Sequence, residues 1–408
     1  MAKNLFHSQF RDNRVLLLQG PVGPFFNRLS KDLRARQNRV FKVNFNAGDC
    51  FFYPNGLLFR DSIDTLNSFL SRTITENQVN AVVLFGDCRP IHRVALKVAT
   101  DMGVQIFVFE EGYIRPNHIT LEQVGVNGNS LLPKNTEYYS QQIINQPVVE
   151  TEIGKTYWYA ALWSVLYYTA ASLGSFRFPN YQHHRPLSIS EGIPWLIGGL
   201  RKFKFKLRER NIEHRLSHEL KNQYFLAPLQ VPSDAQIEFH SNFSDVSEFI
   251  QTIICSFATH ASQDTFLVIK QHPFDRGYND YTGIIHQFSR KHGVADRVLY
   301  IHDQHLPTLL KNARGVVTIN STVGLSAIHH SIPTIVCGEA VYDIPQMCFQ
   351  GSLNDFWQQA KEFIVNHELY DKYIAYLEQR CQVNGSFYRR IKNTDNYAGL
   401  NLSRENFL

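Results

Sequence analysis

The segment FVFEEGYIRPNHITLEQVGVNG, residues 107–128, decides how this chain folds and where its chemistry is expected. It continues an apolar run that starts at Val104, and such a run is typical of a buried parallel strand. Glu110 and Glu111 end the run, just before Gly112. In an open α/β sheet, ligands bind beyond the carboxyl ends of the strands. The two carboxylates therefore stand where a catalytic site is expected.

The residues after this pair add further polar chemistry. Arg115, Asn117, His118 and Glu122 follow within a few positions. Two neighbouring carboxylates can supply one ionised and one protonated group, as acid and base work requires. The alternative is an acidic turn that is merely solvated. The many charged residues close by favour a catalytic site over such a turn.

Working outward, apolar runs alternate with helical patterns on both sides of this segment. In the first part we expect strands at 14–20, 39–45, 81–87 and 104–112, with helices at 24–38, 60–77 and 91–102. The same alternation restarts near residue 222, with strands at 224–230 and 265–273, a helix at 246–261 and further strands at RVLYIHD, GVVTIN and PTIVCG. Repeated strand–helix–strand units indicate parallel sheets with right-handed crossovers.

The pattern predicts an α/β protein of the GT-B-like class. Two Rossmann-like domains would face a cleft, with a helical aromatic and basic section between them. The expected boundaries are 1–140 for the N-terminal, acceptor-side domain, 141–221 for the middle section and 222–408 for the donor-side domain with its C-terminal helices. Glycosyltransferases and some sugar-nucleotide epimerases share this organisation, so the fold alone does not decide the function.

The middle section has an unusual composition. No charged residue occurs in 156–176, where six tyrosines and tryptophans stand, and 201–210 holds six Lys or Arg. Amphipathic aromatic residues beside a basic patch are typical of attachment to an anionic membrane surface. Two alternatives stay open: a helix buried between domains, followed by an ordinary basic helix, and a true membrane span.

Bulk composition narrows the class of protein. The 408 residues are 44% hydrophobic and 13% aromatic, which permits a large core and argues against disorder. A net charge of +5 is too small to indicate nucleic-acid binding. The six cysteines form no CxxC pair or zinc pattern, as in a reducing compartment, and the N-terminus has no signal-peptide core. We therefore expect a cytoplasmic location.

Two motifs at strand ends of the first half are candidate substrate sites. In GPVGPFFNRL (20–29) the glycines allow close backbone approach, and a following helix start favours an anion or a polar sugar group. A tight structural turn explains the glycines equally well. In FGDCRPIHR (85–93) the fork of an arginine can clamp a carboxylate or phosphate, and a structural ion pair is the alternative. The candidate substrate-binding residues are Gly20, Gly23, Asn27, Asp87, Arg89 and His92.

Two motifs at strand ends of the second half are candidate phosphate sites. KQHP (270–273) combines a lysine with a strand-end histidine that can donate to a phosphate. INSTVGLSA (319–327) is a strand, a polar turn and a helix start, whose amides and hydroxyls can bind an anion. Helix capping alone would also explain a Ser or Thr there. The candidate donor-binding residues are Lys270, Gln271, His272, Pro273, Asn320, Ser321, Thr322 and Gly324. Neither a Walker loop, GxGxxG nor DxD is present, so we expect no nicotinamide, no metal and no other cofactor.

Together these motifs resemble the capsule polysaccharide biosynthesis family of the KpsS/LipB type. The resemblance rests on LLLQGPVGPFF, KVNFNAGD, LFGDCRPIHR, FEEGYIRPNHITLEQVGVNG, FLAPLQ, KQHP and NSTVGLSA, and it covers the chain from about Val15 to about Gly338. It implies a β-Kdo transferase that takes Kdo from CMP-Kdo and starts a linker on a phosphatidylglycerol-type lipid. Such an enzyme works as a peripheral protein at the cytoplasmic face of a Gram-negative inner membrane. Its partners would be CMP-Kdo, the lipid, the anionic membrane surface and other capsule synthesis and export proteins, with no nucleic acid.

The resemblance also implies roles for single residues. The catalytic carboxylate of the related transferases lies in an acidic-acidic-glycine motif, which matches Glu110, Glu111 and Gly112. Many relatives have Asp where this chain has Glu111, so its role as nucleophile or base stays open. Arg115 is the third catalytic candidate. His272 and Pro273 match the contact with the CMP phosphate, and the run from Asn320 to Thr322 matches the rest of the nucleotide site.

Two other functions remain open at this stage. One is a different GT-B sugar-nucleotide enzyme, a transferase or an epimerase, which would bind UDP in place of CMP. The other is a non-catalytic scaffold for capsule export that keeps the fold of a transferase.

Overall fold

The computed structural model describes residues 5–6, 10–142, 150–182, 192–232 and 235–402. The chain forms two compact units. The first comprises residues 1–131, 144–189 and 374–408, and the second comprises 132–143 and 190–373. The expected boundaries at 140 and 221 therefore need correction. The C-terminal 35 residues, expected in the second domain, belong to the first, because their strand pairs with its sheet.

The first unit is built on a seven-stranded sheet in the order β12-β6-β5-β4-β1-β2-β3. Its strands are β1 Arg14–Leu17, β2 Arg39–Asn44, β3 Leu57–Leu58, β4 Ala81–Phe85, β5 Gln105–Glu111, β6 His118–Gln123 and β12 Gln382–Asn384. β1 to β5 are parallel, β6 is antiparallel to β5, and β12 is antiparallel to β6. The helices are α1 Phe25–Ala35, α2 Ala47–Phe52, α3 Leu66–Asn77, α4 Pro90–Asp101 and α6 Tyr157–Leu173.

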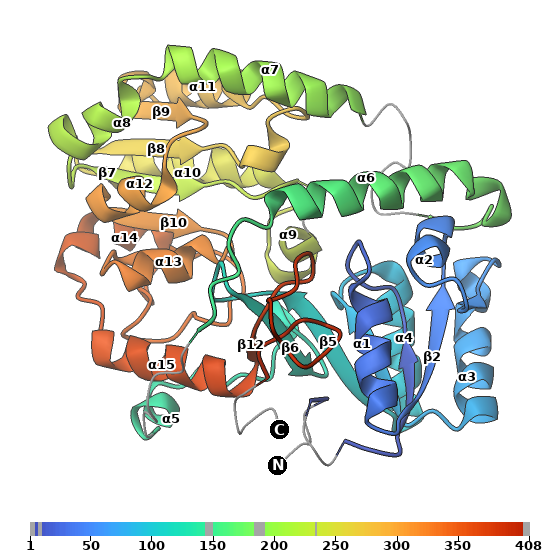
Figure 1. Ribbon diagram of the computed structural model, residues 1–408. Coiled ribbons are helices and arrows are strands. Elements are labelled where there is room, and N and C mark those ends of the chain that lie inside the picture. Colours follow the sequence, from blue (N-terminus) through green and yellow to red (C-terminus); the bar gives the residue numbers. More distant parts are fainter. Residues whose placement is uncertain (1–4, 7–9, 143–149, 183–191, 233–234, 403–408) are drawn as a thin grey trace. The chain divides into compact units, whose positions relative to one another are not determined.

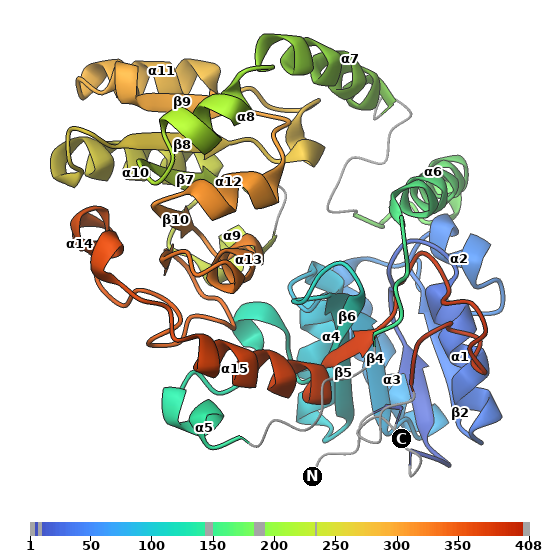
Figure 2. The same ribbon diagram turned by 60° about the vertical axis from the view of Figure 1, so that its left-hand side comes forward.

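Alternating side chains of these strands form two cores, one on each face of the sheet. Figures 1 and 2 show the strands of this sheet and the helices around them. On one face α1 and the C-terminal segment pack against Phe107 and Phe109 of β5. On the other face α3 and α4 pack against Ile106 and Val108. A strand that is apolar on both faces has to be covered on both sides. This requirement explains why the run before Glu110 is apolar without alternation.

The second unit has a fully parallel five-stranded sheet in the order β11-β10-β7-β8-β9. Its strands are β7 Tyr224–Pro228, β8 Phe266–Lys270, β9 Val298–Ile301, β10 Gly315–Thr318 and β11 Thr334–Val336. The helices are α5 Thr136–Ser140, α7 Gly192–Arg208, α8 Ile212–His214, α9 Ala235–His240, α10 Val246–His260, α11 Thr282–Lys291, α12 Leu306–Asn312, α13 Val323–His329 and α14 Leu353–Gln359. Helix α15, His367–Arg380, runs from this unit into the first.

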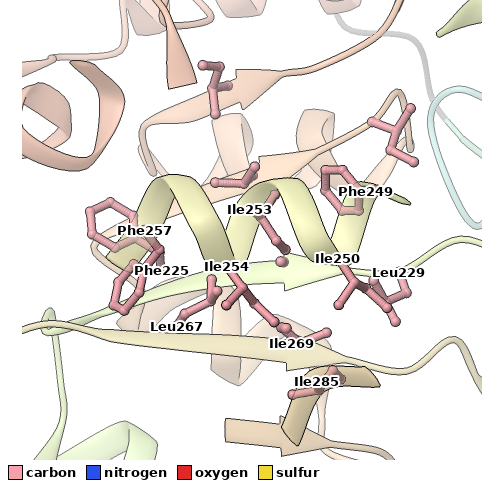
Figure 3. Packing of buried hydrophobic residues seen from close by; sticks show 14 of the residues in the cluster. Phe225, Leu229, Phe249, Ile250, Ile253, Ile254, Phe257, Leu267, Ile269 and Ile285 are labelled. Atoms are coloured by element: carbon pink, nitrogen blue, oxygen red, sulfur yellow. The ribbon is translucent and has the colours of Figure 1, made fainter. Parts of the chain in front are cut away.

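Helix α10 shows how sequence specifies this unit. Asp245 caps it by accepting a hydrogen bond from the backbone of Glu248. Its apolar residues recur three and four apart and form one buried face, against which β7 and β8 pack (Figure 3). Each fully buried Ile or Phe contributes roughly 1.5–3 kcal/mol. The expected GT-B-like class of two Rossmann-like domains joined through a helical section is confirmed.

Candidate functional site

Glu111 lies at the carboxyl end of β5, as the sequence predicted. Its Oε1 accepts a hydrogen bond of 2.7 Å from the hydroxyl of Tyr388. Burial, with the charge of Glu111, raises the pKa of this tyrosine well above its ordinary value, so the hydroxyl stays a donor. Sequence reasoning missed Tyr388, because the C-terminal segment that carries it shows no motif of its own. A half-buried carboxylate held by a neutral donor is suited to act as a base or a nucleophile.

Glu110 points to the opposite face of β5, as alternation requires. A Cβ on Gly86 would lie 3.4 Å from Glu110 Oε2 and 3.9 Å from Arg89 Nε, which places both side chains beside that glycine. Burial raises the pKa of Glu110 to about 7, and the nearby charge of Arg89 lowers it in part. The strand end therefore offers two different carboxyl groups. One is close to half-protonated at neutral pH, and the other is held by a tyrosine.

Arg89 belongs to a network that the sequence only partly predicted. Its Nη1 donates to Gln19 Oε1 over 3.0 Å, and Gln19 Nε2 donates to the hydroxyls of Tyr181 (2.9 Å) and Tyr167 (3.2 Å). Tyr167 in turn donates to Asp49 over 3.0 Å. The sequence predicted Tyr167 only as a membrane-interface aromatic, and it pointed to neither Tyr181 nor Gln19. Packing of α6 against α2 brings Tyr167 to the ends of β1 and β2.

A cavity of about 90 Å³ lies beside this network in the first unit. The cavity is lined by apolar side chains, among them Phe45 and Phe59, and by polar groups of the network. Its lining residues are Gln19, Phe45, Phe59, Asp61, Ser62, Ile63, Arg89, Pro90, Ile91, Asn180, Tyr181 and Gln182. Its charged lining residues are Arg89 and Asp61, so the cavity combines apolar walls with a few polar groups, as small-molecule sites do.

The other residues of the FGDCRPIHR motif are engaged in the fold. Asp87 is buried, and its Oδ2 accepts from the backbone of Val126 (2.9 Å) and from Asn129 Nδ2 (3.1 Å). His92 is fully buried with Nδ1 2.6 Å from the carbonyl of Gly86. Burial, with the charge of Arg89, lowers the pKa of His92 to about 3, so the ring is neutral. Both residues position the loop that carries Arg89.

The glycine motif after β1 also has structural partners. Gly23 has φ +106°, a conformation that only glycine adopts readily, and a Cβ there would lie 3.0 Å from the ring of Trp163. Gly20 packs against the ring of Phe26. Asn27 donates through Nδ2 to the carbonyl of Phe52 over 2.9 Å. The turn is therefore shaped by packing against α1, α2 and α6.

Residues His118–Gln123 form the strand β6, which the sequence analysis did not predict. In β6 the buried Ile119 and Leu121 alternate with polar residues, the ordinary pattern of a strand. Glu122 is buried and accepts from Tyr113 over 2.6 Å and from Ser130, and burial raises its pKa to about 7.

The remaining polar residues around β6 take part in local contacts. Arg115 donates from Nε to the carbonyl of Gly112 over 3.1 Å. Among the described residues, His118, Glu150 and Glu378 form the one group whose ligand atoms are close enough to hold a metal ion, within 4.8 Å of one another. His118 Nε2 lies 3.3 Å from Glu150 Oε1, within the distance of an ion pair if the ring is protonated.

In the second unit, KQHP forms the carboxyl end of β8 and the start of a short 3-10 helix, Pro273–Asp275. His272 Nδ1 accepts from the backbone of Phe274 over 3.2 Å, so in the neutral ring Nε2 carries the hydrogen. Lys270 is buried, which lowers its pKa to about 8, while the charge of Asp303 opposes that shift. Gln271 is buried and donates to the carbonyl of Asn279 over 2.9 Å.

The polar turn after β10 lies at the same edge of this sheet, because β7 separates β10 from β8 and all three are parallel. Asn320 is anchored by Gln230, which donates to its Oδ1 over 2.9 Å, and Asn320 Nδ2 donates to the carbonyl of Gln236. Ser321 Oγ accepts from the backbone of Val323 over 3.3 Å. Gln230, at the end of the quoted β7 segment, had not been picked out.

Thr322 and Gly324 open the seven-residue helix α13. Thr322 makes no side-chain capping bond, unlike the cap that the sequence suggested. A Cβ on Gly324 would lie 2.2 Å from the hydroxyl of Tyr342, so close packing requires glycine there. Together the two strand ends place Lys270, His272 and the 320–322 turn at the same edge of one sheet.

The middle section divides between the two units. Helix α6 buries Tyr167 and Ala171 and exposes Trp158, Leu162 and Val165 among others. Helix α7 contains most of the basic stretch. In the part of the chain that the structure describes, no helix combines the length and the apolar character needed to cross a membrane.

Comparison with known proteins shows where this chain belongs. Over 93% of its length it is 38% identical to the capsule polysaccharide modification protein LipB of Neisseria meningitidis serogroup A, covering 94% of that protein. It is 36% identical to the capsule polysaccharide export protein KpsS of Escherichia coli, over 92% of this chain and 97% of that one. A solved structure, KpsC of Thermosulfurimonas dismutans, a beta Kdo 2,7 transferase, is similar at 14% identity and TM-score 0.40, over 90% of this chain and 100% of that one. At these values the structural similarity adds no argument of its own.

Residues 80–388, which hold both carboxylates of β5, Tyr388 and the strand ends of the second unit, match the family model for capsule polysaccharide biosynthesis proteins. With this match and the two relatives, the chain belongs to the capsule polysaccharide biosynthesis protein family.

Proposed function

We propose that this protein is a glycosyltransferase of capsule polysaccharide biosynthesis that transfers Kdo from CMP-Kdo to a phosphatidylglycerol-type lipid and so starts a β-Kdo linker. The observation that carries the proposal is the hydrogen bond between Tyr388 and Glu111 at the carboxyl end of β5. It holds a carboxylate at the position where parallel sheets bind ligands. The names of the relatives, a capsule modification and a capsule export protein, support the same pathway.

The chemistry assigns different tasks to the two units. The bond between the anomeric carbon of Kdo and the phosphate of CMP breaks, and CMP leaves with the electron pair. Glu111 acts either as the base that accepts the proton of the lipid hydroxyl or as the nucleophile that first takes the sugar. Charge on the leaving phosphate would be stabilised by Nε2 of His272, with the ammonium of Lys270 and the 320–322 turn nearby.

On the acceptor side we place Arg89 and the cavity beside it. The guanidinium suits the phosphate of the lipid, and the apolar lining suits its glycerol and the first part of its chains. Asp87, His92 and Asn27 act through the loops that they hold, because their polar atoms contact the protein itself. Arg115 contacts the loop after Glu111 through Gly112 and is a positioning residue in this scheme.

A lipid acceptor places the reaction at a membrane, and we propose the cytoplasmic face of the inner membrane, together with other capsule synthesis and export proteins. We also propose that transfer needs no metal, since the leaving group can be stabilised by His272 and Lys270. Incubation with excess EDTA should then leave the rate unchanged. A rate that collapses and returns on adding Mg²⁺ or Zn²⁺ would overturn the metal-free scheme.

The decisive experiment is incubation with CMP-Kdo and a fluorescent phosphatidylglycerol analogue, followed by mass analysis. The expected product carries one added Kdo and forms together with CMP. UDP-sugars serve as the matched control. Turnover of a UDP-sugar alone would assign the protein to another sugar-nucleotide reaction, and binding of CMP-Kdo without any product would favour a non-catalytic role in export.

A further inference from the structure

Helix α7 carries an apolar stripe that faces water. Leu200, Phe203 and Leu207 recur three and four residues apart, which places them on one side of the helix. Their side chains are 75%, 68% and 61% exposed. Largely exposed apolar side chains that share one face of a helix are typical of a surface that docks on something else.

The opposite face of α7 is attached to the second unit. Arg201 Nη1 donates to the carbonyl of Arg276 over 2.9 Å. The ring of Phe205 stacks on His302 with centroids 3.5 Å apart. Glu209, just after the helix, is buried and accepts from the backbone of His302 over 3.0 Å. The apolar stripe therefore points away from the surface on which α7 lies.

Cations flank the stripe on both sides. At 3.6 residues per turn, Lys204 falls beside the stripe on one side and Lys206 on the other, with Arg208 and Lys202 further round the helix on the same two sides. All four side chains are exposed. An apolar stripe between two rows of basic residues fits the surface of a bilayer with anionic headgroups, where the stripe enters the acyl boundary and the cations meet phosphates.

The loops that α7 contacts follow β8 and β9, on the side of the sheet where we propose that the sugar donor CMP-Kdo binds. Arg276 lies in the loop after β8, four residues beyond His272, and Gly198 of α7 packs against the neighbouring Gly277. His302 and Asp303 follow β9, the strand that pairs with β8. An ion pair between Arg276 and Asp303 joins the two loops. The contacts of α7 described above therefore all reach loops at the carboxyl edge of β8 or β9.

We propose that α7 docks on an anionic bilayer through this stripe and its flanking cations, and that docking fixes the loops after β8 and β9 in the arrangement that binds the nucleotide. The second part rests on the proposed function, which makes these loops the donor side. Because coupling between two binding events is reciprocal, the membrane strengthens nucleotide binding by the same factor by which the nucleotide strengthens membrane binding.

The docking surface is tested by co-sedimentation with vesicles of phosphatidylglycerol and phosphatidylcholine, and with vesicles of phosphatidylcholine alone. The full-length protein should bind only the anionic vesicles. The triple variant Leu200→Ser, Phe203→Ser, Leu207→Ser should bind at least about tenfold more weakly. Ile364→Ser changes an even more exposed apolar residue of the same unit; it is the control and should bind like the wild type. If the triple variant binds the vesicles as the wild type does, the proposed docking surface is wrong. It is also wrong if the protein ignores the vesicles and instead self-associates, and the triple substitution abolishes this self-association.

The coupling is tested by calorimetry with CMP, with and without the anionic vesicles. CMP affinity should rise by about fivefold or more when vesicles are present. Phe205→Ala leaves the stripe and its cations in place but removes the stacking on His302, so it should still bind vesicles and lose the enhancement. Arg201→Lys, which keeps the charge, is the second variant if Phe205→Ala unfolds. CMP affinity that ignores the vesicles refutes the coupling. Neither measurement uses sugar transfer, so failure of the proposed reaction would be seen separately.

Discussion

Glu111 is the residue on which the proposed chemistry depends. Glu111→Gln keeps the shape and can still accept the hydrogen bond of Tyr388, but it cannot take up a proton or attack a sugar. We expect turnover with CMP-Kdo to fall by at least ~10² while CMP affinity and thermal unfolding stay unchanged. Tyr388→Phe is the matched partner and should cost less, since the carboxylate remains. Near-wild-type turnover in Glu111→Gln would remove the residue from catalysis.

His272 is expected to bind the CMP phosphate through Nε2, because Nδ1 already accepts from the backbone of Phe274. His272→Ala removes both the phosphate donor and this cap, whereas His272→Asn can keep the cap. Both variants should weaken CMP binding in calorimetry, typically by about tenfold for one lost charged hydrogen bond, without changing affinity for the lipid. If the Asn variant binds CMP as the wild type does, the histidine only caps the loop.

Glu122 gives a prediction about pH. Burial raises its pKa from the ordinary 4.5 to about 7, and Glu110 is raised in the same direction. At pH values between 4.5 and about 7, these carboxyl groups keep their protons in the folded state but lose them in the unfolded state. The free energy of unfolding therefore falls as pH rises from 5 to 8. We expect Glu122→Gln, which stays neutral, to reduce this fall by about 1–3 kcal/mol in chemical denaturation. A parallel pH dependence in wild type and variant would contradict the assignment.

The sequence could predict those residues whose position follows from the strand that precedes them. Glu111, Arg89 and His272 each follow an apolar run, and the carboxyl end of a parallel strand has a known relation to ligands. Tyr388 could not be predicted in this way. Its contact with Glu111 joins two segments far apart in the chain, and only the folded structure brings them together.

In helix α7, the contribution of the basic residues to membrane binding can be tested separately from that of the apolar stripe. Changing Lys202, Lys204 and Lys206 to Glu reverses three charges, each worth about 1 kcal/mol near an anionic surface. Binding to phosphatidylglycerol vesicles should fall in this variant. In the wild type it should fall as added salt shortens the Debye length. Binding that survives high salt and carbonate washing would indicate an integral attachment and exclude surface docking.

Strand β6 shows the limit of sequence patterns at the scale of elements. From the sequence, its polar residues His118 and Glu122 counted as support for a catalytic site, although they alternate with apolar ones. Both are buried, and the edge of β6 pairs over His118–Thr120 with β12, a strand of only three residues with no apolar run. Because β6 pairs with a three-residue segment far away in the sequence, the residues around β6 carry no pattern that predicts this pairing.

At the scale of the whole chain, the C-terminal residues complete the first unit. Phe387 is fully buried, with its ring 4.9 Å from Phe25 and 5.2 Å from Phe85 between centroids. Phe387→Ala should destabilise the first unit by about 3–5 kcal/mol. The surface change Tyr397→Ala, in the same segment, serves as control. Differential scanning calorimetry should show an earlier transition in the Phe387 variant, and an unchanged thermogram would contradict the packing described.

The return of residues 374–408 to the first sheet also has a consequence for how the protein is made on the ribosome. The strands from β1 to β6 leave the ribosome early, yet the edge of β6 stays unpaired until the whole second unit has been translated, a delay on the order of tens of seconds. An unpaired strand edge invites wrong partners. We expect nascent chains arrested at residue 373 to be cleaved by protease within 14–131, and chains released at 408 to resist. Equal resistance would mean that the first unit is stable before its last strand is made.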